Sequence, residues 1–269
     1  MSTHRWLVLI GGIALIFVLF SLPKVVVDND AIDTEIVDTA APVEGTHGFS
    51  ISEADQKRRD FLKNQLADAD KEKSVIFADS LARLYLGYNQ LDSASYFADV
   101  ILEYDQSIVG QQKAGEIYFQ LFGISLNQAD LAKYANKAQV CFQKVIEEKE
   151  DPDTKAKLAM TMVISDNPMQ GISMLREILD EYPDNTTALY SLGMLSIQSG
   201  QYDKAIGRFE KLMTIDATNQ QAAFLLATSY FETGQRDKAK QWFENIKSTS
   251  TDPAILSSTD QYLKELNEF

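Results

Sequence analysis

The hydrophobic pattern of the chain opens with an uninterrupted apolar stretch. Residues 6–23 are eighteen positions without a charged side chain, preceded by Arg5 and followed by Lys24. As a helix this stretch spans roughly 27 Å, close to the hydrocarbon thickness of a bilayer. Trp6 and the flanking cations suit the two membrane interfaces. The pattern predicts a transmembrane anchor over residues 1–24.

A cleaved signal peptide is the alternative interpretation of this stretch. Such a peptide needs a small-x-small cleavage site soon after its apolar region, but Pro23 and Lys24 come next and Ala40-Ala41 lies too far downstream. We therefore expect an uncleaved anchor. Arg5 and the N-terminal amino group favour a cytoplasmic N-terminus, because basic residues collect on that side. The rest of the chain is then expected on the periplasmic side of a bacterial inner membrane.

The pattern becomes polar and acidic over residues 25–49. Between residues 28 and 49 there are six acidic side chains, no basic one and little apolar bulk. Such a segment repels itself and cannot bury enough surface to fold, so we expect a disordered acidic linker. As a flexible coil it reaches roughly 25 Å, which suits a spacer.

Small and aromatic positions then recur with a period of thirty-four residues. This spacing is typical of stacked pairs of antiparallel helices, in which small residues let neighbouring helices approach closely. Gly200 and Gly234 are expected to end first helices in the left-handed conformation. The small residues of the first helices are Ala82, Gly115, Ala159, Gly193 and Ala227, and those of the second helices are Ala94, Ala138, Gly171, Ala205 and Ala239.

These residues resemble the tetratricopeptide repeat family. The resemblance implies an all-α fold, a right-handed solenoid of about five helical hairpins. Residues 50–74 are expected to form a leading helix capped at Ser50 or Ser52, and residues 254–269 a capping helix. The repeats are expected over residues 75–253, divided into 75–107, 108–151, 152–185, 186–219 and 220–253.

The second of these repeats is longer than the others. Tyr118 and Ala138 are 20 residues apart, whereas the matching Ser196 and Ala205 are 9 apart. We expect a hairpin lengthened by about three helical turns around residues 123–125. It is interpreted as drift in a tolerant loop, with a docking knob as the alternative.

Composition and charge exclude several classes of function. The 39 acidic and 25 basic side chains give a net charge of −14, which argues against binding to nucleic acid. Cys141 is the single cysteine, and both histidines, His4 and His47, precede the predicted repeats. This removes disulfides and most metal-binding or nucleophilic chemistry. We expect no cofactor, no metal and no catalytic residue, with Cys141 as a small buried hydrophobe.

The family resemblance also implies where a partner binds. First helices of such repeats line a concave groove, through residues three before, one after and four after the small packing residue. In this chain the groove is expected to be polar over the first two repeats and apolar over the last three. The third repeat places Ala156 among these positions and the fifth places Thr228. The candidate binding residues are Met160, Val163, Tyr190, Met194, Ile197, Phe224 and Phe231.

The occupant of this groove is expected to be an apolar peptide or helix of a protein partner, or a second copy of the chain as a homodimer. The alternative is that the capping helix already covers these residues. The first functional hypothesis is accordingly a membrane-anchored, non-catalytic adaptor at the cell envelope. The second reverses the topology and makes the chain a cytosol-facing receptor for targeting peptides. An enzyme has the weakest support.

Overall fold

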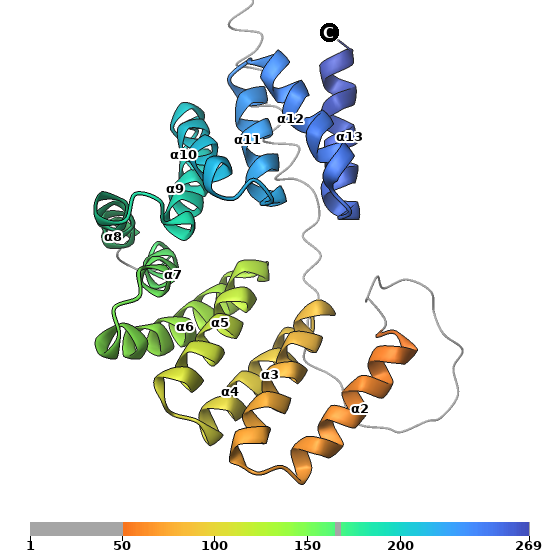
Figure 1. Ribbon diagram of the computed structural model, residues 1–269, viewed down its shortest axis with the longest axis vertical. Helices are drawn as coiled ribbons and strands as arrows, with labels where there is room; N and C mark the ends of the chain where they lie inside the picture. Colours follow the sequence, from red (N-terminus) through yellow and green to blue (C-terminus); the bar gives the residue numbers. More distant parts are fainter. Residues whose placement is uncertain (1–50, 165–167, 269) are drawn as a thin grey trace, which may run out of the picture. The chain divides into compact units, whose positions relative to one another are not determined.

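A computed structural model of the protein describes residues 51–164 and 168–268, all within the compact unit that begins at Gly48. Over these residues the chain forms twelve α-helices and no strand (Figure 1). The predicted anchor and acidic linker lie outside the described residues. Among the helices that are described, none is both long and apolar enough to cross a bilayer.

The helices follow one another as a leading helix, five hairpins and a final helix (Figure 1). The leading helix α2 spans Glu53–Ala67, and Ser52 caps it by accepting a hydrogen bond from the Asp55 amide, as expected. The hairpins and the final helix are α3 (Lys71–Gly87) with α4 (Leu91–Tyr104), α5 (Ile108–Ile124) with α6 (Gln128–Glu148), α7 (Pro152–Met162) with α8 (Pro168–Glu181), α9 (Thr186–Gln198) with α10 (Tyr202–Ile215), α11 (Gln220–Glu232) with α12 (Arg236–Thr249), and α13 (Pro253–Asn267).

The contacts between hairpins distinguish the first helices from the second ones. Each first helix contacts the first helix of the next hairpin, in the order α3, α5, α7, α9 and α11, and α11 contacts α13 in the same way. Over the described residues the backbones of successive second helices do not approach in this way, and α4 and α6 meet through side chains, as in the Lys137–Asp99 ion pair. The first helices therefore form the inner layer of a helical-hairpin solenoid.

Small residues allow the close approach within each hairpin that the repeat pattern predicts. A Cβ atom added at Gly193 would lie 2.6 Å from the ring of Phe209, and one added at Gly115 would lie 2.7 Å from the ring of Phe142. Both rings come from the second helix of the same hairpin and are fully buried. Glycine is thus required at both positions for the ring to pack against the backbone.

The first helices of three hairpins end in the same way. Gly200 and Gly234 have φ of +70° and +73°, as predicted, and Asn89 takes the equivalent place with φ of +55°. In each case the next amide donates to a carbonyl five residues earlier, as Gln201 does to Ser196 at 2.7 Å. This is the Schellman arrangement, which needs a left-handed residue at the helix end.

The second hairpin is longer than its neighbours, as its sequence spacing predicts. Helices α5 and α6 have 17 and 21 residues, whereas α9 and α10 have 13 and 14. The turn between them exposes Leu126 almost completely, at 96%.

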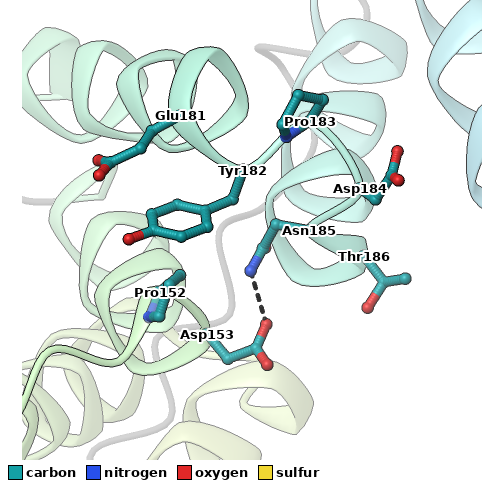
Figure 2. A pocket seen from close by; sticks show the side chains of 8 residues that line it. All are labelled: Pro152, Asp153, Glu181, Tyr182, Pro183, Asp184, Asn185 and Thr186. Carbon is teal, nitrogen blue, oxygen red and sulfur yellow. Dashed lines mark hydrogen bonds between the residues drawn. The ribbon is translucent and has the colours of Figure 1, made fainter.

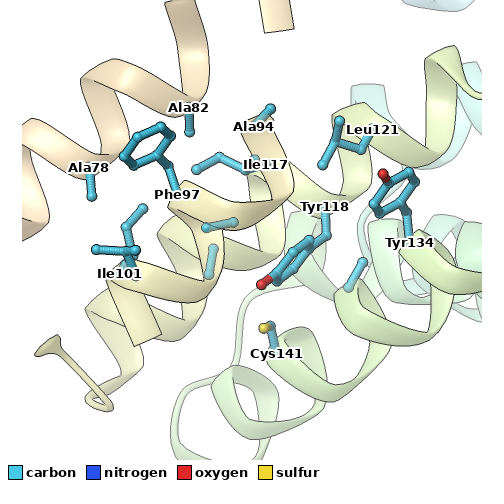
Figure 3. Close-up of a cluster of buried hydrophobic side chains, with 14 of the residues drawn as sticks. Ala78, Ala82, Ala94, Phe97, Ile101, Ile117, Tyr118, Leu121, Tyr134 and Cys141 are labelled. Carbon is cyan, nitrogen blue, oxygen red and sulfur yellow. The ribbon is translucent and has the colours of Figure 1, made fainter. Parts of the chain in front are cut away.

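The buried side chains form three clusters. The first runs from α2 to α7, the last from α9 to α13, and a small one joins α7, α8 and α9. Cys141 lies in the first cluster beside Tyr118, and its burial raises the pKa of the thiol to about 11 (Figure 3). The expectation of a small buried hydrophobe is confirmed.

Candidate functional site

The seven candidate binding residues are all half-buried and lie on the first helices α7, α9 and α11 or directly after α7. Met160 packs against the first core cluster, and Val163 follows the last residue of α7. Four others pack against the last cluster: Tyr190, Ile197, Phe224 and Phe231. Met194 is half-buried on α9. Ala156, which the repeat register also assigned to the groove, is fully buried in the small cluster. That assignment was wrong, because α8 and α9 enclose the start of α7.

In the fourth hairpin, the aromatic candidate residue Tyr190 packs on a ring of the core. Tyr190 packs edge-on against Phe209, with ring centroids 6.1 Å apart. Burial raises the pKa of its phenol. Met194 and Ile197 are half-buried on the next turns of the same helix. The fourth hairpin therefore offers an apolar strip whose base is fixed by the core.

The fifth hairpin is partly covered by the last helix. Tyr262 of α13 contacts Phe224 and Phe231 edge-on, at centroid distances of 5.9 and 5.1 Å, and stacks on Phe243 at 4.9 Å. Burial raises the pKa of Tyr262, opposed by a hydrogen bond with Thr228. One side chain of α13 thus reaches all three predicted groove positions of this hairpin. Phe224 and Phe231 remain half-buried, as Tyr190, Met194 and Ile197 are, but their rings already contact Tyr262.

The matching surface of the first two hairpins is polar and paired internally. Arg83 donates to Asp79 at 3.0 Å within α3, and Gln112 donates to Glu116 at 2.8 Å within α5. Lys157 of α7 forms an ion pair with Glu116. Of these three contacts, the Lys157–Glu116 ion pair joins two hairpins and the other two lie within one helix.

A shallow hollow of about 460 Å³ lies where α7 and the α8–α9 turn meet (Figure 2). Asn185 donates to Asp153 at 2.8 Å, and Thr187 donates to the same carboxylate at 3.0 Å. Tyr182 donates to Glu150 at 2.9 Å. These groups satisfy one another and cap α9, so the hollow is a structural joint between hairpins. The sequence analysis did not single it out.

No group of three or more metal-ligating side chains comes together among the residues that the structure describes.

Comparison with known proteins supports the repeat assignment for part of the chain. A model of the tetratricopeptide repeat family matches residues 196–257, which include part of the fourth hairpin, the whole of the fifth and the start of α13. Over these residues the chain matches the tetratricopeptide repeat family. The chain is 26% identical over 123 residues to surface lipoprotein assembly modifier 1 of Neisseria meningitidis, covering 44% of this chain and 24% of that protein.

Other relatives match similar portions. Tetratricopeptide repeat protein 8 of Caenorhabditis elegans is 24% identical over 104 residues, which cover 39% of this chain and 21% of that protein. The chain thus spans about a quarter or less of these curated relatives. Among solved structures, a tetratricopeptide repeat protein from Parabacteroides merdae is 15% identical with a TM-score of 0.49, covering 80% of this chain and 90% of that one. The protein YrrB is 20% identical with a TM-score of 0.41, covering 78% and 98%.

Proposed function

We propose that this protein is a membrane-tethered, non-catalytic adaptor that holds an apolar peptide or helix of a partner protein. The partner lies across the first helices of the third and fourth repeats. Residues 1–24 anchor the chain, residues 25–49 space the repeats from the bilayer, and the repeats face the periplasm. The family match supports one part of this proposal, because tetratricopeptide repeats commonly mediate interactions between proteins.

The half-buried apolar strip on α7 and α9 is the observation that favours this function. Tyr190, Met194 and Ile197 present half-buried apolar surface on α9, and the ring contact recorded for Tyr190 is with Phe209 of its own hairpin, not with α13. An apolar surface of this kind is typical of an interaction site. A partner that completes the burial of one such side chain gains up to roughly 1.5–3 kcal/mol before entropic costs.

The envelope setting draws on the anchor pattern and on the relatives. Two of the relatives, from Neisseria meningitidis and Haemophilus influenzae, are surface lipoprotein assembly modifiers by name. Topology is tested by placing a cysteine at Thr39 and labelling intact cells with a membrane-impermeant thiol reagent. The native Cys141 is buried and does not compete. We expect labelling; protection would instead favour the cytosol-facing receptor.

The binding strip is tested by co-purification from mild detergent. We expect the double variant Tyr190→Ser and Met194→Ser to lose the partner that the unmodified chain retains, with its helical circular dichroism unchanged. The control is Tyr96→Ser, which removes a 61% exposed tyrosine from the second helix α4. Equal recovery of the partner by the double variant and the control would contradict the assignment.

A further inference from the structure

A group of three side chains recurs where successive repeats meet. At the junction of the first and second repeats, Tyr118 donates to Asp99 at 2.6 Å and Lys137 pairs with the same carboxylate at 2.7 Å. Lys137 also lies over the Tyr118 ring, 4.9 Å from its centroid. The carboxylate comes from a second helix, and the tyrosine and lysine come from the next repeat.

The junction of the fourth and fifth repeats has the same group at the same register. Tyr230 donates to Glu210, and Lys238 lies over the Tyr230 ring, 4.8 Å from its centroid. In both junctions the carboxylate stands five residues after the second small residue of its repeat. The tyrosine stands three after the first small residue of the next repeat, and the lysine directly precedes the second one.

The junction of the third and fourth repeats departs from this pattern. The carboxylate position holds Arg176, the tyrosine position holds Ser196, and the lysine position holds Lys204. The remaining junction, between the second and third repeats, holds uncharged residues at the same three places: Gln143, Met162 and Gln170. The junction of the third and fourth repeats is therefore the one in which an arginine replaces the expected carboxylate.

A second arginine joins this site from the fourth repeat. Arg208 is three residues after the second small residue, a place that is apolar in the other repeats: Phe97, Cys141, Met174 and Trp242. Its guanidinium donates to the Ser196 hydroxyl and, at 3.2 Å, to the Leu192 carbonyl. Burial and the nearby charge of Arg176 both lower the pKa of Arg208.

Neither arginine is neutralised by the described part of the chain. Among the described residues no carboxylate forms an ion pair with Arg176 or Arg208, and Lys204 donates to Gln201. Arg176 is exposed and Arg208 is half-buried, and the charge of Arg176 disfavours the charged form of Arg208. The chain as a whole carries a net charge of −14, so these two arginines form a local positive site on an otherwise acidic protein.

We propose that Arg176 and Arg208 form a binding site for a carboxylate of a partner protein, an aspartate or glutamate side chain. The partner's carboxylate binds beside the two guanidinium groups and supplies the negative charge that Asp99 and Glu210 supply at the other two junctions. Guanidinium groups bind a carboxylate through paired hydrogen bonds, which suits them to this role. The site is separate from the apolar strip, so it does not depend on the function proposed above.

Thermal unfolding of the full-length protein in detergent tests this site. The probe is N-acetylglutamate, compared with N-acetylglutamine and with inorganic phosphate at one ionic strength. At several times its Kd, N-acetylglutamate is expected to raise the Tm by about 2–4 °C, and the other two compounds less. Arg176→Gln should abolish the difference. Lys144→Gln, which removes an exposed lysine from the second helix α6, should retain it.

A second variant tests the site without any ligand. Arg176→Glu restores the carboxylate of the other junctions and should raise the Tm by about 2–4 °C, because it pairs with Arg208. A lower Tm in this variant would overturn the proposal. So would equal responses to N-acetylglutamate and N-acetylglutamine, or a larger response to phosphate, which would indicate a general anion site.

Discussion

Two glycines on adjacent helices should respond oppositely to the same substitution. Gly193 in α9 has the Phe209 ring where a Cβ atom would be, at 2.6 Å, whereas a Cβ atom at Gly207 in α10 would have no neighbour within 4 Å. Alanine in a helix is favoured over glycine by about 1 kcal/mol. Gly207→Ala should therefore gain up to that amount. Gly193→Ala gains the same propensity but must displace a fully buried ring, and overpacking of a core costs about 1–3 kcal/mol.

The net expectation is that Gly193→Ala lowers the free energy of unfolding by about 1 kcal/mol, taking the middle of that range. The two variants should then differ by about 2 kcal/mol, or roughly 4–8 °C in Tm. Urea and thermal unfolding followed by circular dichroism measure both quantities. If Gly193→Ala were as stable as Gly207→Ala, the close packing of α10 against α9 and the repeat register based on it would be refuted.

Three further perturbations follow from the structure. Gly200→Ala should lower the free energy of unfolding by about 1 kcal/mol in a urea titration, because φ at this position is +70°; no loss would contradict the left-handed helix end. The Cys141 thiol is buried and its pKa is raised to about 11, so it should react with a thiol reagent only as fast as the protein opens. The control is Val140→Cys in a Cys141→Ser background, which places a thiol at a 58% exposed position and should react at once. The hydrogen bond from Tyr182 to Glu150 raises the pKa of the phenol from 10.0 to about 12. The contribution of this bond to stability is therefore complete below pH 10 and is lost as the pH rises towards 12. Tyr182→Phe should remove this part of the alkaline sensitivity, measured as Tm against pH.

Much of the fold can be predicted from the sequence because the repeat pattern records packing directly. Glycine at residues 115 and 193 follows from the ring that lies against each backbone, and φ above zero at Gly200 and Gly234 follows from the helix ends. The left-handed Asn89 is harder to see, since asparagine tolerates that conformation without requiring it. The buried Ala156 was misplaced because register alone does not show how neighbouring helices close over the start of α7.

The candidate site could be predicted only in outline. The register of the first helices identifies Tyr190, Met194 and Ile197, but it does not show that Tyr262 leans over Phe224 and Phe231. That contact depends on the size of a single side chain in α13, at a place outside the repeat pattern. The contact of Arg208 with Ser196, and the nearness of the Arg176 charge, likewise need the helices to be positioned first, because the three residues lie on three different helices.

Site-specific photocrosslinking measures most directly whether the strip holds a partner. A photoreactive amino acid replaces Met194 on the strip or, as the control, Tyr96 on the second helix α4, each in the full-length protein in cells. The account predicts one defined crosslinked protein from position 194 that is absent from position 96, and its loss when Tyr190 is also changed to serine. Crosslinks from position 96 alone, or identical products from both positions, would contradict it.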